Sequence, residues 1–244
     1  MEEYSPIQVL KSVDDHIWIV DGSLISFKGV PFPTRMTVIR LESGDLFIHS
    51  PIELDDRLKH EIDQLGTVKH LISPNKIHYW WIDQWAKAYP DAIKWASPGS
   101  QKAATKQGWH FNRDLAETPD KAWSNEIDQL IVRGSRLLEE VVFFHKRSRT
   151  LILADLIENF ESKKVQSRFL RLMIKLAGNL DPDGKLPIDL RLGYFGRHAV
   201  LRSSVKTMLS WHPERIILAH GRWYSCNGTA ELKRSFRWVK GIED

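Results

Sequence analysis

The stretch from Glu140 to Asp155 constrains the fold more than any other, because it reads as two buried strands joined by a charged hairpin. Residues 141–144 and 150–154 are short, largely apolar runs, which are typical of strands covered on both faces. His145 follows the first run and Asp155 follows the second. Two potential metal ligands therefore stand where buried strands give way to loops, and α/β proteins usually carry their chemistry at such places.

The composition predicts one globular, soluble, cytoplasmic domain covering residues 1–244. Hydrophobic residues make up 42% and charged residues 27% of the chain, which are ordinary globular values. No stretch reaches the roughly 20 apolar residues that span a bilayer, and the first residues lack the features of a signal peptide. Cys226 is the only cysteine, so a thiolate-rich metal site is excluded and any metal must be held by histidine and carboxylate.

The order of predicted elements indicates mixed sheets covered by helices. Strands are expected at 16–20, 36–40 and 46–49, followed by a helix at 54–64, with the Gly- and Pro-rich segment 29–33 as a link. Strands and helices then alternate through 70–73, 82–89, 92–96, 100–107 and 127–132. After Asp155 a helical insertion is expected at about 160–212, with helices at 163–177 and 199–211, before a last strand at 215–219 and a helix at 230–239.

Four positions share one pattern, in which a β-rich run is followed at once by a potential ligand. They are the loop after residues 70–73, which contains Asn75 and His78, and then His145, Asp155 and His220. Zinc and other first-row metals bind imidazole nitrogen and carboxylate oxygen, and a catalytic site needs about three protein ligands. The alternative for each residue alone is a polar side chain satisfied by local hydrogen bonds at a strand end. The recurrence of the pattern favours a metal site made of His78, His145, Asp155 and His220.

At these residues the chain resembles the metallo-β-lactamase-fold proteins. In that superfamily a His-x-His-x-Asp-His loop follows an early strand, and a lone His follows a middle strand. An Asp follows the next strand, and a His-Gly pair follows the last one. Phe144-His145 is similar to the segment with the lone His, and residues 148–155, which end in Asp155, are similar to the segment with the Asp. Leu218-Ala-His220-Gly221 is similar to the segment with the final His-Gly. Segments such as Ser73-Pro-Asn-Lys-Ile-His78 resemble a domain-of-unknown-function branch of the superfamily.

The departure from the superfamily pattern lies in the loop of residues 73–83, which keeps one histidine. In one register His78 and Tyr79 occupy the positions of the last two ligands, and in another Asn75 occupies the first. Asp83 is a further carboxylate in the loop, although a helix cap is the preferred reading. Lys76 opposes cation binding unless its ammonium points away. A single metal ion is therefore expected rather than two.

The resemblance implies a four-layer αββα sandwich of two mixed sheets and hydrolysis of an ester, thioester, amide or phosphodiester. It implies one divalent ion, zinc before iron or manganese, with Asp155 as a catalytic ligand and His145 as a ligand or proton carrier. A metal lowers the pKa of bound water toward about 7 and polarises the bond to be cleaved. The alternatives are a small-molecule binding protein that keeps the fold without metal, and a nuclease, since the net charge is +4. The substrate and the oligomeric state stay open.

Two further groups have competing readings. Trp80, Trp81 and Trp85 are expected either to wall the site or to pack a helix onto the sheet. The basic residues of the predicted helix at 163–177 are read as a solvated face over core residues such as Phe169 and Leu172. Contact with an anionic membrane or a partner is the alternative.

Overall fold

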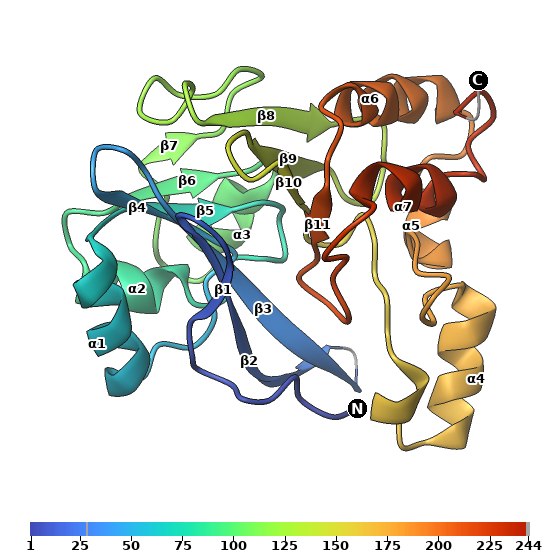
Figure 1. Cartoon of the computed structure of the whole chain (residues 1–244), viewed down its shortest axis with the longest axis horizontal. Helices are drawn as coiled ribbons and strands as arrows, with labels where there is room; N and C mark the ends of the chain where they lie inside the picture. Colours follow the sequence, from blue (N-terminus) through green and yellow to red (C-terminus); the bar gives the residue numbers. More distant parts are fainter. Residues whose placement is uncertain (28, 243–244) are drawn as a thin grey trace. The chain divides into compact units, whose positions relative to one another are not determined.

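The computed structural model describes residues 1–27 and 29–242, and the chain divides into two compact units. The N-terminal unit comprises Glu3–Ala116, and the C-terminal unit comprises Glu117–Asp244 together with Met1 and Glu2. Each unit contains one β-sheet, and Figure 1 shows the elements that surround it. Among the described residues, no helix is both long and apolar enough to cross a bilayer.

The N-terminal unit is built on a mixed seven-stranded sheet whose strands lie in sequence order. Its strands are β1 (Lys11–Asp14), β2 (Ile17–Phe27), β3 (Val30–Arg40), β4 (Asp45–His49), β5 (Thr67–Ser73), β6 (Ile93–Ala96) and β7 (Arg113–Asp114). Pairing is antiparallel from β1 to β4 and parallel from β4 to β7. The predicted change from antiparallel strands to strand–helix alternation is therefore confirmed.

Three helices accompany this sheet: α1 (Asp56–Leu65), α2 (Ile82–Ala88) and α3 (Ser100–Thr105). The Asp55 carboxylate caps α1 by accepting a 2.7 Å hydrogen bond from the Leu58 amide. Trp85 of α2 is fully buried, and its indole nitrogen donates to the Ile52 carbonyl oxygen at 2.7 Å. For Trp85 the packing role is therefore confirmed.

In the segment expected to be a link, residues 29–33, Gly29 lies in a turn and residues 30–33 are instead the start of β3. Pro31 and Pro33 are tolerated because β3 pairs with β4 only from Thr37 onward, so the first half of the strand has a neighbour on one side alone. The β2–β3 register also shifts between Gly22 and Ile25, which accommodates the second proline at an irregular position.

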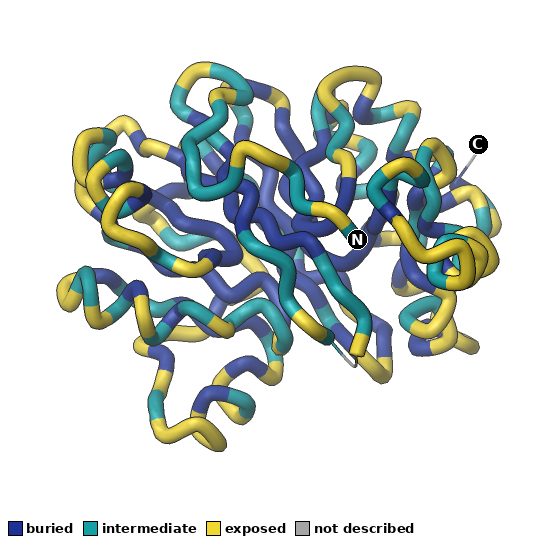
Figure 2. The backbone as a smooth tube through the Cα atoms, turned by 90° about the horizontal axis from the view of Figure 1, so that it is seen from below, coloured by how far each residue is buried: buried dark blue, intermediate teal, exposed yellow. Residues whose placement is uncertain are grey.

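The C-terminal unit contains a four-stranded sheet in the order β11-β10-β9-β8. The strands are β8 (Ile127–Val132), β9 (Glu140–His145), β10 (Thr150–Ile152) and β11 (Arg215–Ile217). Strands β9 and β10 form the predicted antiparallel hairpin, and β10 runs parallel to β11. All residues of β9 and β10 are buried, as the apolar runs indicated, and dark blue marks such buried strands in Figure 2.

The helices of the C-terminal unit lie mainly in the chain between β10 and β11. They are η1 (Ser162–Lys164), α4 (Arg168–Ala177), α5 (Ile188–Leu192), α6 (His198–Ser210) and, after β11, α7 (Gly228–Ser235). The expected helix at 163–177 is thus a short 3-10 turn followed by α4, because Ser167 caps α4 by accepting from the Leu170 amide at 3.2 Å. Leu201, Val205 and Met208 of α6 and Leu232 of α7 belong to the core of this unit.

Candidate metal centre

The sheet of the C-terminal unit brings Asp155 and His220 together. Ile152 of β10 is in register with Ile217 of the parallel strand β11, and each candidate ligand follows three residues later. His220 Nε2 lies 3.2 Å from Asp155 Oδ1, and both side chains are buried. Imidazole nitrogen and carboxylate oxygen are ligand types that first-row divalent metals prefer. The two side chains are close enough to bind the same ion.

Gly221 allows the chain to turn directly after His220. Its φ is +89°, and a Cβ atom at this position would collide with the carbonyl group of Asn159. Asn159 forms an isolated β-bridge with Gly221, in which its backbone carbonyl oxygen accepts a 2.7 Å hydrogen bond from the Arg222 amide. Only glycine meets both requirements, which explains in physical terms why His220 is followed by glycine.

Glu140 holds the backbone of Asp155. Its two carboxylate oxygens accept hydrogen bonds from the Ala154 amide at 2.8 Å and the Asp155 amide at 2.7 Å, and Glu140 itself is 1% exposed. The sequence analysis missed this residue, although the predicted hairpin contained the signal. In an antiparallel pair, the residue that begins the first strand lies beside the residue that follows the second.

The same pairing shows that His145 does not lie with Asp155, so the prediction that it shares a site with Asp155 and His220 is wrong. His145 is paired with Thr150, at the opposite end of the β9–β10 hairpin. Asp155 is five positions further along the chain than Thr150, which is roughly 15 Å of extended chain. His145 Nδ1 instead lies 2.7 Å from Ser148 Oγ, so the imidazole belongs to the hairpin turn. The prediction used only the fact that each residue follows a strand. Because β9 and β10 are antiparallel, the residues that follow them lie at opposite ends of the hairpin.

Glu158 is a second acidic residue near Asp155 and His220 that the sequence analysis did not identify. Burial raises the pKa of its carboxyl to about 8, with further contributions from the charges of His220, which lowers it, and Asp155, which raises it. Asn179 Nδ2 donates to Glu158 Oε2 at 2.7 Å. The side chain is therefore largely protonated at neutral pH, so it adds little negative charge beside Asp155.

His78 belongs to the N-terminal unit, on the loop that follows β5. Ser50 Oγ lies 2.7 Å from its Nδ1. Asn75 is fully buried and shapes the loop, because its Oδ1 accepts from the amides of Ile77 at 3.0 Å and His78 at 3.2 Å. His49, at the end of β4, is also buried, and burial followed by the charge of His78 lowers its pKa to about 3.

The other candidates in this loop have structural partners of their own. Gln107 Nε2 donates to the Tyr79 hydroxyl oxygen at 3.1 Å, and the Tyr79 ring lies against Trp109. Asp83 forms an ion pair at 2.8 Å with Lys87, one turn further along α2. Lys76 is exposed, so its ammonium is solvated.

Comparison with known structures identifies the fold. The DIM-1 metallo-β-lactamase exposed to ceftazidime matches with a TM-score of 0.64 and 14% identity, covering 98% of this chain and 97% of that one. A metallo-β-lactamase from Pontibacter korlensis matches with a TM-score of 0.61 and 11% identity over 96% and 99%. FIM-1 from Pseudomonas aeruginosa in its mono-zinc form matches with a TM-score of 0.60 and 10% identity over 98% and 97%. The expected class, an αββα sandwich of the metallo-β-lactamase type, is therefore confirmed.

Sequence comparison gives the family. No curated protein matches the chain. Residues 14–176 match the family model described as Domain of unknown function (DUF4336), which is more than half of the chain. The match contains His78, Glu140 and Asp155, whereas His220 lies beyond it. The protein therefore belongs to the DUF4336 family, and it has the metallo-β-lactamase fold.

Proposed function

We propose that the protein is a metal-dependent hydrolase with a mononuclear site, in which Asp155, His220 and His78 hold one divalent ion. The observation that carries the proposal is the buried Asp155–His220 pair, in which Glu140 fixes the backbone of Asp155. His78 is included because it is the histidine of the loop where the superfamily carries ligands. A hydrogen bond between Ser50 and its Nδ1 is the support that metal-binding histidines commonly have.

The donor set fits one divalent ion better than two. Two neutral imidazoles and one carboxylate are a known three-ligand combination for catalytic zinc. Glu158 is mostly protonated at neutral pH, so it does not supply the second anionic ligand that another cation would need. The FIM-1 structure in its mono-zinc form is one neighbour of this fold with a single zinc ion. Zinc is the ion we expect first, and iron and manganese are the alternatives.

When bound, a divalent ion supplies Lewis acidity at the scissile bond and makes water acidic enough to react near neutral pH. The residues of the chain position that chemistry. Glu140 fixes the direction of the Asp155 backbone, and Asp155 offers its carboxylate toward His220. Glu158 holds a proton on its carboxyl at neutral pH, and a protonated acid of this kind is suited to protonate a leaving group. The proposed substrates are small-molecule esters, thioesters, amides or phosphodiesters.

A non-catalytic binding protein is the second candidate, favoured by the loop of residues 73–83. Asn75 is engaged with the loop backbone, and Tyr79 and Asp83 contact Gln107 and Lys87. The loop thus offers His78 and no additional ligand with an open role. The third candidate is a nuclease, whose substrate would be nucleic acid. The assay below separates the three candidates.

The test is hydrolysis of a panel of chromogenic esters, thioesters, amides and phosphodiesters, including nucleic acid. The protein is assayed as purified, after chelation, and after zinc is restored. We expect one substrate class to be cleaved, with activity lost on chelation and regained with zinc. Asp155→Asn should lower activity at least about a hundredfold, because a ligand is weakened. Asp128→Asn, which alters a partly exposed carboxylate of the same unit that pairs with Lys146, is the control. Activity that survives chelation and Asp155→Asn would contradict the proposal.

A further inference from the structure

Helix α4 exposes an apolar stripe, contrary to the expectation that its apolar residues are core. Ile174 is its buried residue, whereas Phe169, Leu172, Met173 and Leu176 are 74%, 53%, 48% and 67% exposed. These four positions follow the spacing i, i+3, i+4 and i+7, so their side chains form one continuous stripe on a helix. Contiguous exposed apolar surface of this kind marks an interaction site on a folded protein.

A second group of exposed apolar residues lies on α5 and the turn after it. Ile188, Leu192 and Phe195 are exposed large apolar residues, spaced by four and three positions. Arg191 of α5 is tied to the end of α4, because its Nη2 donates to the Ala177 carbonyl oxygen at 2.8 Å. We call the exposed apolar residues of α4, α5 and the turn after α5 the α4–α5 surface: Phe169, Leu172, Met173, Leu176, Ile188, Leu192 and Phe195.

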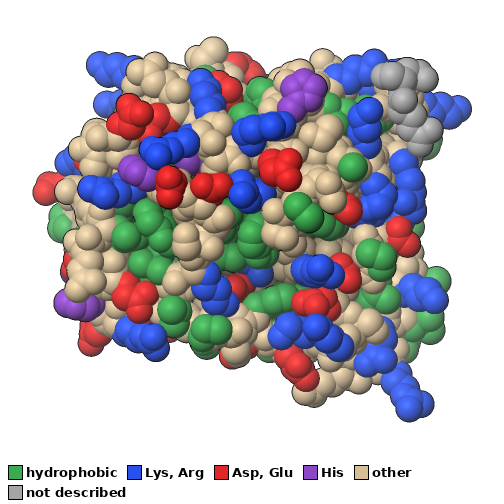
Figure 3. Space-filling view, viewed as in Figure 1, with side chains coloured by type: hydrophobic (Ala, Val, Ile, Leu, Met, Phe, Trp, Pro, Cys, Tyr) green, Lys and Arg blue, Asp and Glu red, His purple; other side chains and the backbone are tan. Residues whose placement is uncertain are grey.

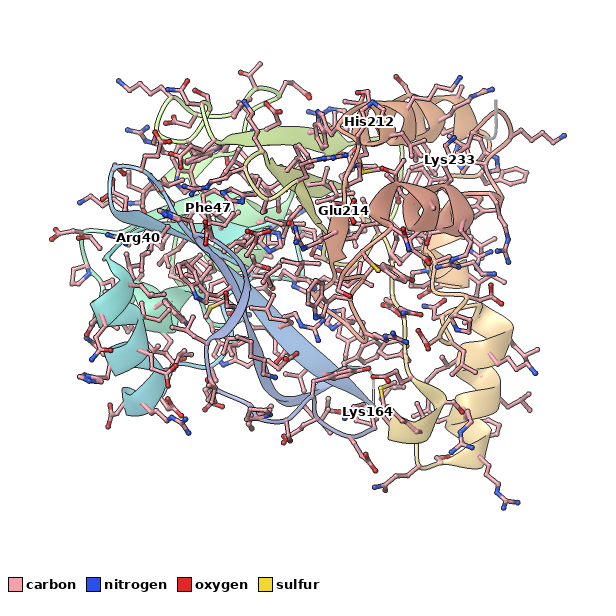
Figure 4. All side chains as sticks on the ribbon, viewed as in Figure 1. Arg40, Phe47, Lys164, His212, Glu214 and Lys233 are labelled. Carbon is pink, nitrogen blue, oxygen red and sulfur yellow. The ribbon has the colours of Figure 1, made fainter. Side chains whose placement is uncertain are left out.

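Basic residues flank this stripe, and one of them, Lys163, forms an ion pair with Glu161 at 3.2 Å. The chain has no Asp or Glu from residue 162 to residue 180, but it has five basic residues there: Lys163, Lys164, Arg168, Arg171 and Lys175. At about 100° per residue, Arg168, Arg171 and Lys175 fall on one edge of the apolar stripe. Figure 3 shows blue basic and green apolar side chains next to one another at its lower right, where Figure 1 places α4. Lys164, labelled in Figure 4, belongs to η1, the turn that precedes α4.

We propose that the α4–α5 surface docks the protein on an anionic lipid bilayer. Helices that lie in a membrane interface have this arrangement, with apolar side chains inserted at the headgroup boundary and Lys or Arg beside them. Charge selects the occupant. A second copy of the chain would bring its own basic edge against this one, whereas anionic headgroups complement it. The proposal is independent of metal binding and of hydrolysis.

Co-sedimentation of the full chain with lipid vesicles tests the proposal. One set of vesicles consists of phosphatidylcholine and the other of equal parts phosphatidylcholine and phosphatidylglycerol. We expect the partition coefficient to be at least about tenfold higher for the anionic vesicles and to fall as salt is raised, because headgroup charge attracts the basic edge. Equal partitioning into both sets, or no binding to either, would overturn the proposal.

Variants with matched controls localise the effect. Leu172→Gln combined with Leu176→Gln should reduce binding at least about tenfold, because two inserted apolar side chains are lost. Trp80→Gln, which alters an exposed apolar residue of the N-terminal unit, should leave binding unchanged. Arg168→Gln combined with Lys175→Gln should lower binding to anionic vesicles roughly fivefold per charge. Lys233→Gln on α7 is the charge control (Figure 4).

Two results from these variants would contradict the proposal. One is undiminished vesicle binding by the Leu172→Gln, Leu176→Gln protein. The other is light scattering that shows a dimer of the wild-type chain which this variant abolishes, because the surface would then be an interface between copies. Circular dichroism of each variant verifies that the helical content is kept, so that loss of binding is not loss of fold.

Discussion

The two units position their candidate ligands by different physical means. In the C-terminal unit, the register of β10 with β11 aligns Asp155 with His220, and buried Glu140 fixes the Asp155 backbone. In the N-terminal unit, His78 lies on a loop in which Ser50 Oγ hydrogen-bonds its Nδ1 and Asn75 Oδ1 accepts from its backbone amide. A ligand placed by sheet register shares the stability of the core, whereas one placed by loop hydrogen bonds can be disturbed without unfolding the unit. Substitutions should therefore affect mainly stability in the first case and mainly affinity in the second.

The largest expected effect is the response of the metal-free protein to rising pH through Glu158. Its folded pKa of about 8 lies above the ordinary value of 4.5 for a glutamate, because the carboxyl is buried. The folded state therefore binds more protons than the unfolded state between these values, and stability falls as pH rises. The expected slope is up to roughly 1.4 kcal/mol per pH unit between about pH 5 and 7. Denaturant unfolding in chelator measures it, and Glu158→Gln should flatten the slope. Identical slopes would contradict this reading.

His49 in the N-terminal unit should respond to pH with the opposite sign. Burial, and then the charge of His78, lowers its pKa from 6.5 to about 3, so the folded state disfavours the imidazolium. Its contribution to stability is present above about pH 6.5 and is lost as pH falls toward 3, with the same limiting slope of roughly 1.4 kcal/mol per pH unit. His49→Gln should reduce the loss of stability on acidification from about pH 6 to 4. If the free energy of unfolding falls with decreasing pH equally in the wild-type protein and in His49→Gln, other groups cause the acid sensitivity.

Glu140 provides the next comparison, because Glu139 beside it is a matched control. Glu140→Gln keeps the side-chain size but turns one acceptor into a donor that faces a backbone amide of Ala154 or Asp155. The free energy of unfolding should fall by about 2 kcal/mol, the cost of a buried unsatisfied donor. Glu139 pairs with Arg133 at a partly exposed position, so Glu139→Gln should cost less than about 0.5 kcal/mol. Chemical denaturation of both variants gives the difference, and equal losses would remove the special role of Glu140.

Ser50→Ala is expected to have the smallest effect on stability but a clear effect on metal affinity. It removes the hydrogen bond to His78 Nδ1, and such supporting contacts typically change metal affinity by about tenfold or more. The free energy of unfolding of the metal-free protein should change by less than about 1 kcal/mol. Chelator competition measures the affinity. If affinity is unchanged, His78 is not a ligand, and the proposed set reduces to Asp155 and His220.

Much of the fold was predictable because local patterns determined it. The β9–β10 hairpin follows from two apolar runs around a charged turn, and β11 follows from the short run before His220. The limits of β3 were missed, because its prolines suggest a loop until the one-sided pairing of the strand is known. The burial of α4 was also misjudged. Both of its faces carry apolar residues, Leu170 and Ile174 on one and Phe169 and Leu172 on the other, so periodicity alone cannot say which face packs on the protein.

The site was predictable in part for a related reason. Asp155 and His220 each follow a strand, and adjacent parallel strands bring such residues to the same edge. His145 also follows a strand, but its strand runs antiparallel to β10, so the same rule places it at the far end. Extending the antiparallel pairing of the predicted hairpin places Glu140, and not His145, opposite Asp155. Glu158 gives no signal of this kind, because it follows no strand and its importance comes from burial.

Elemental analysis of the purified protein beside His220→Ala and His145→Gln, each verified as folded, tests whether Asp155 and His220 hold the ion. We expect about one equivalent of a divalent metal in the wild-type protein. We expect the same amount in His145→Gln, whose altered side chain belongs to the hairpin turn, and almost none in His220→Ala. Full metal content in His220→Ala, or its loss in His145→Gln, would show that the ion is held elsewhere.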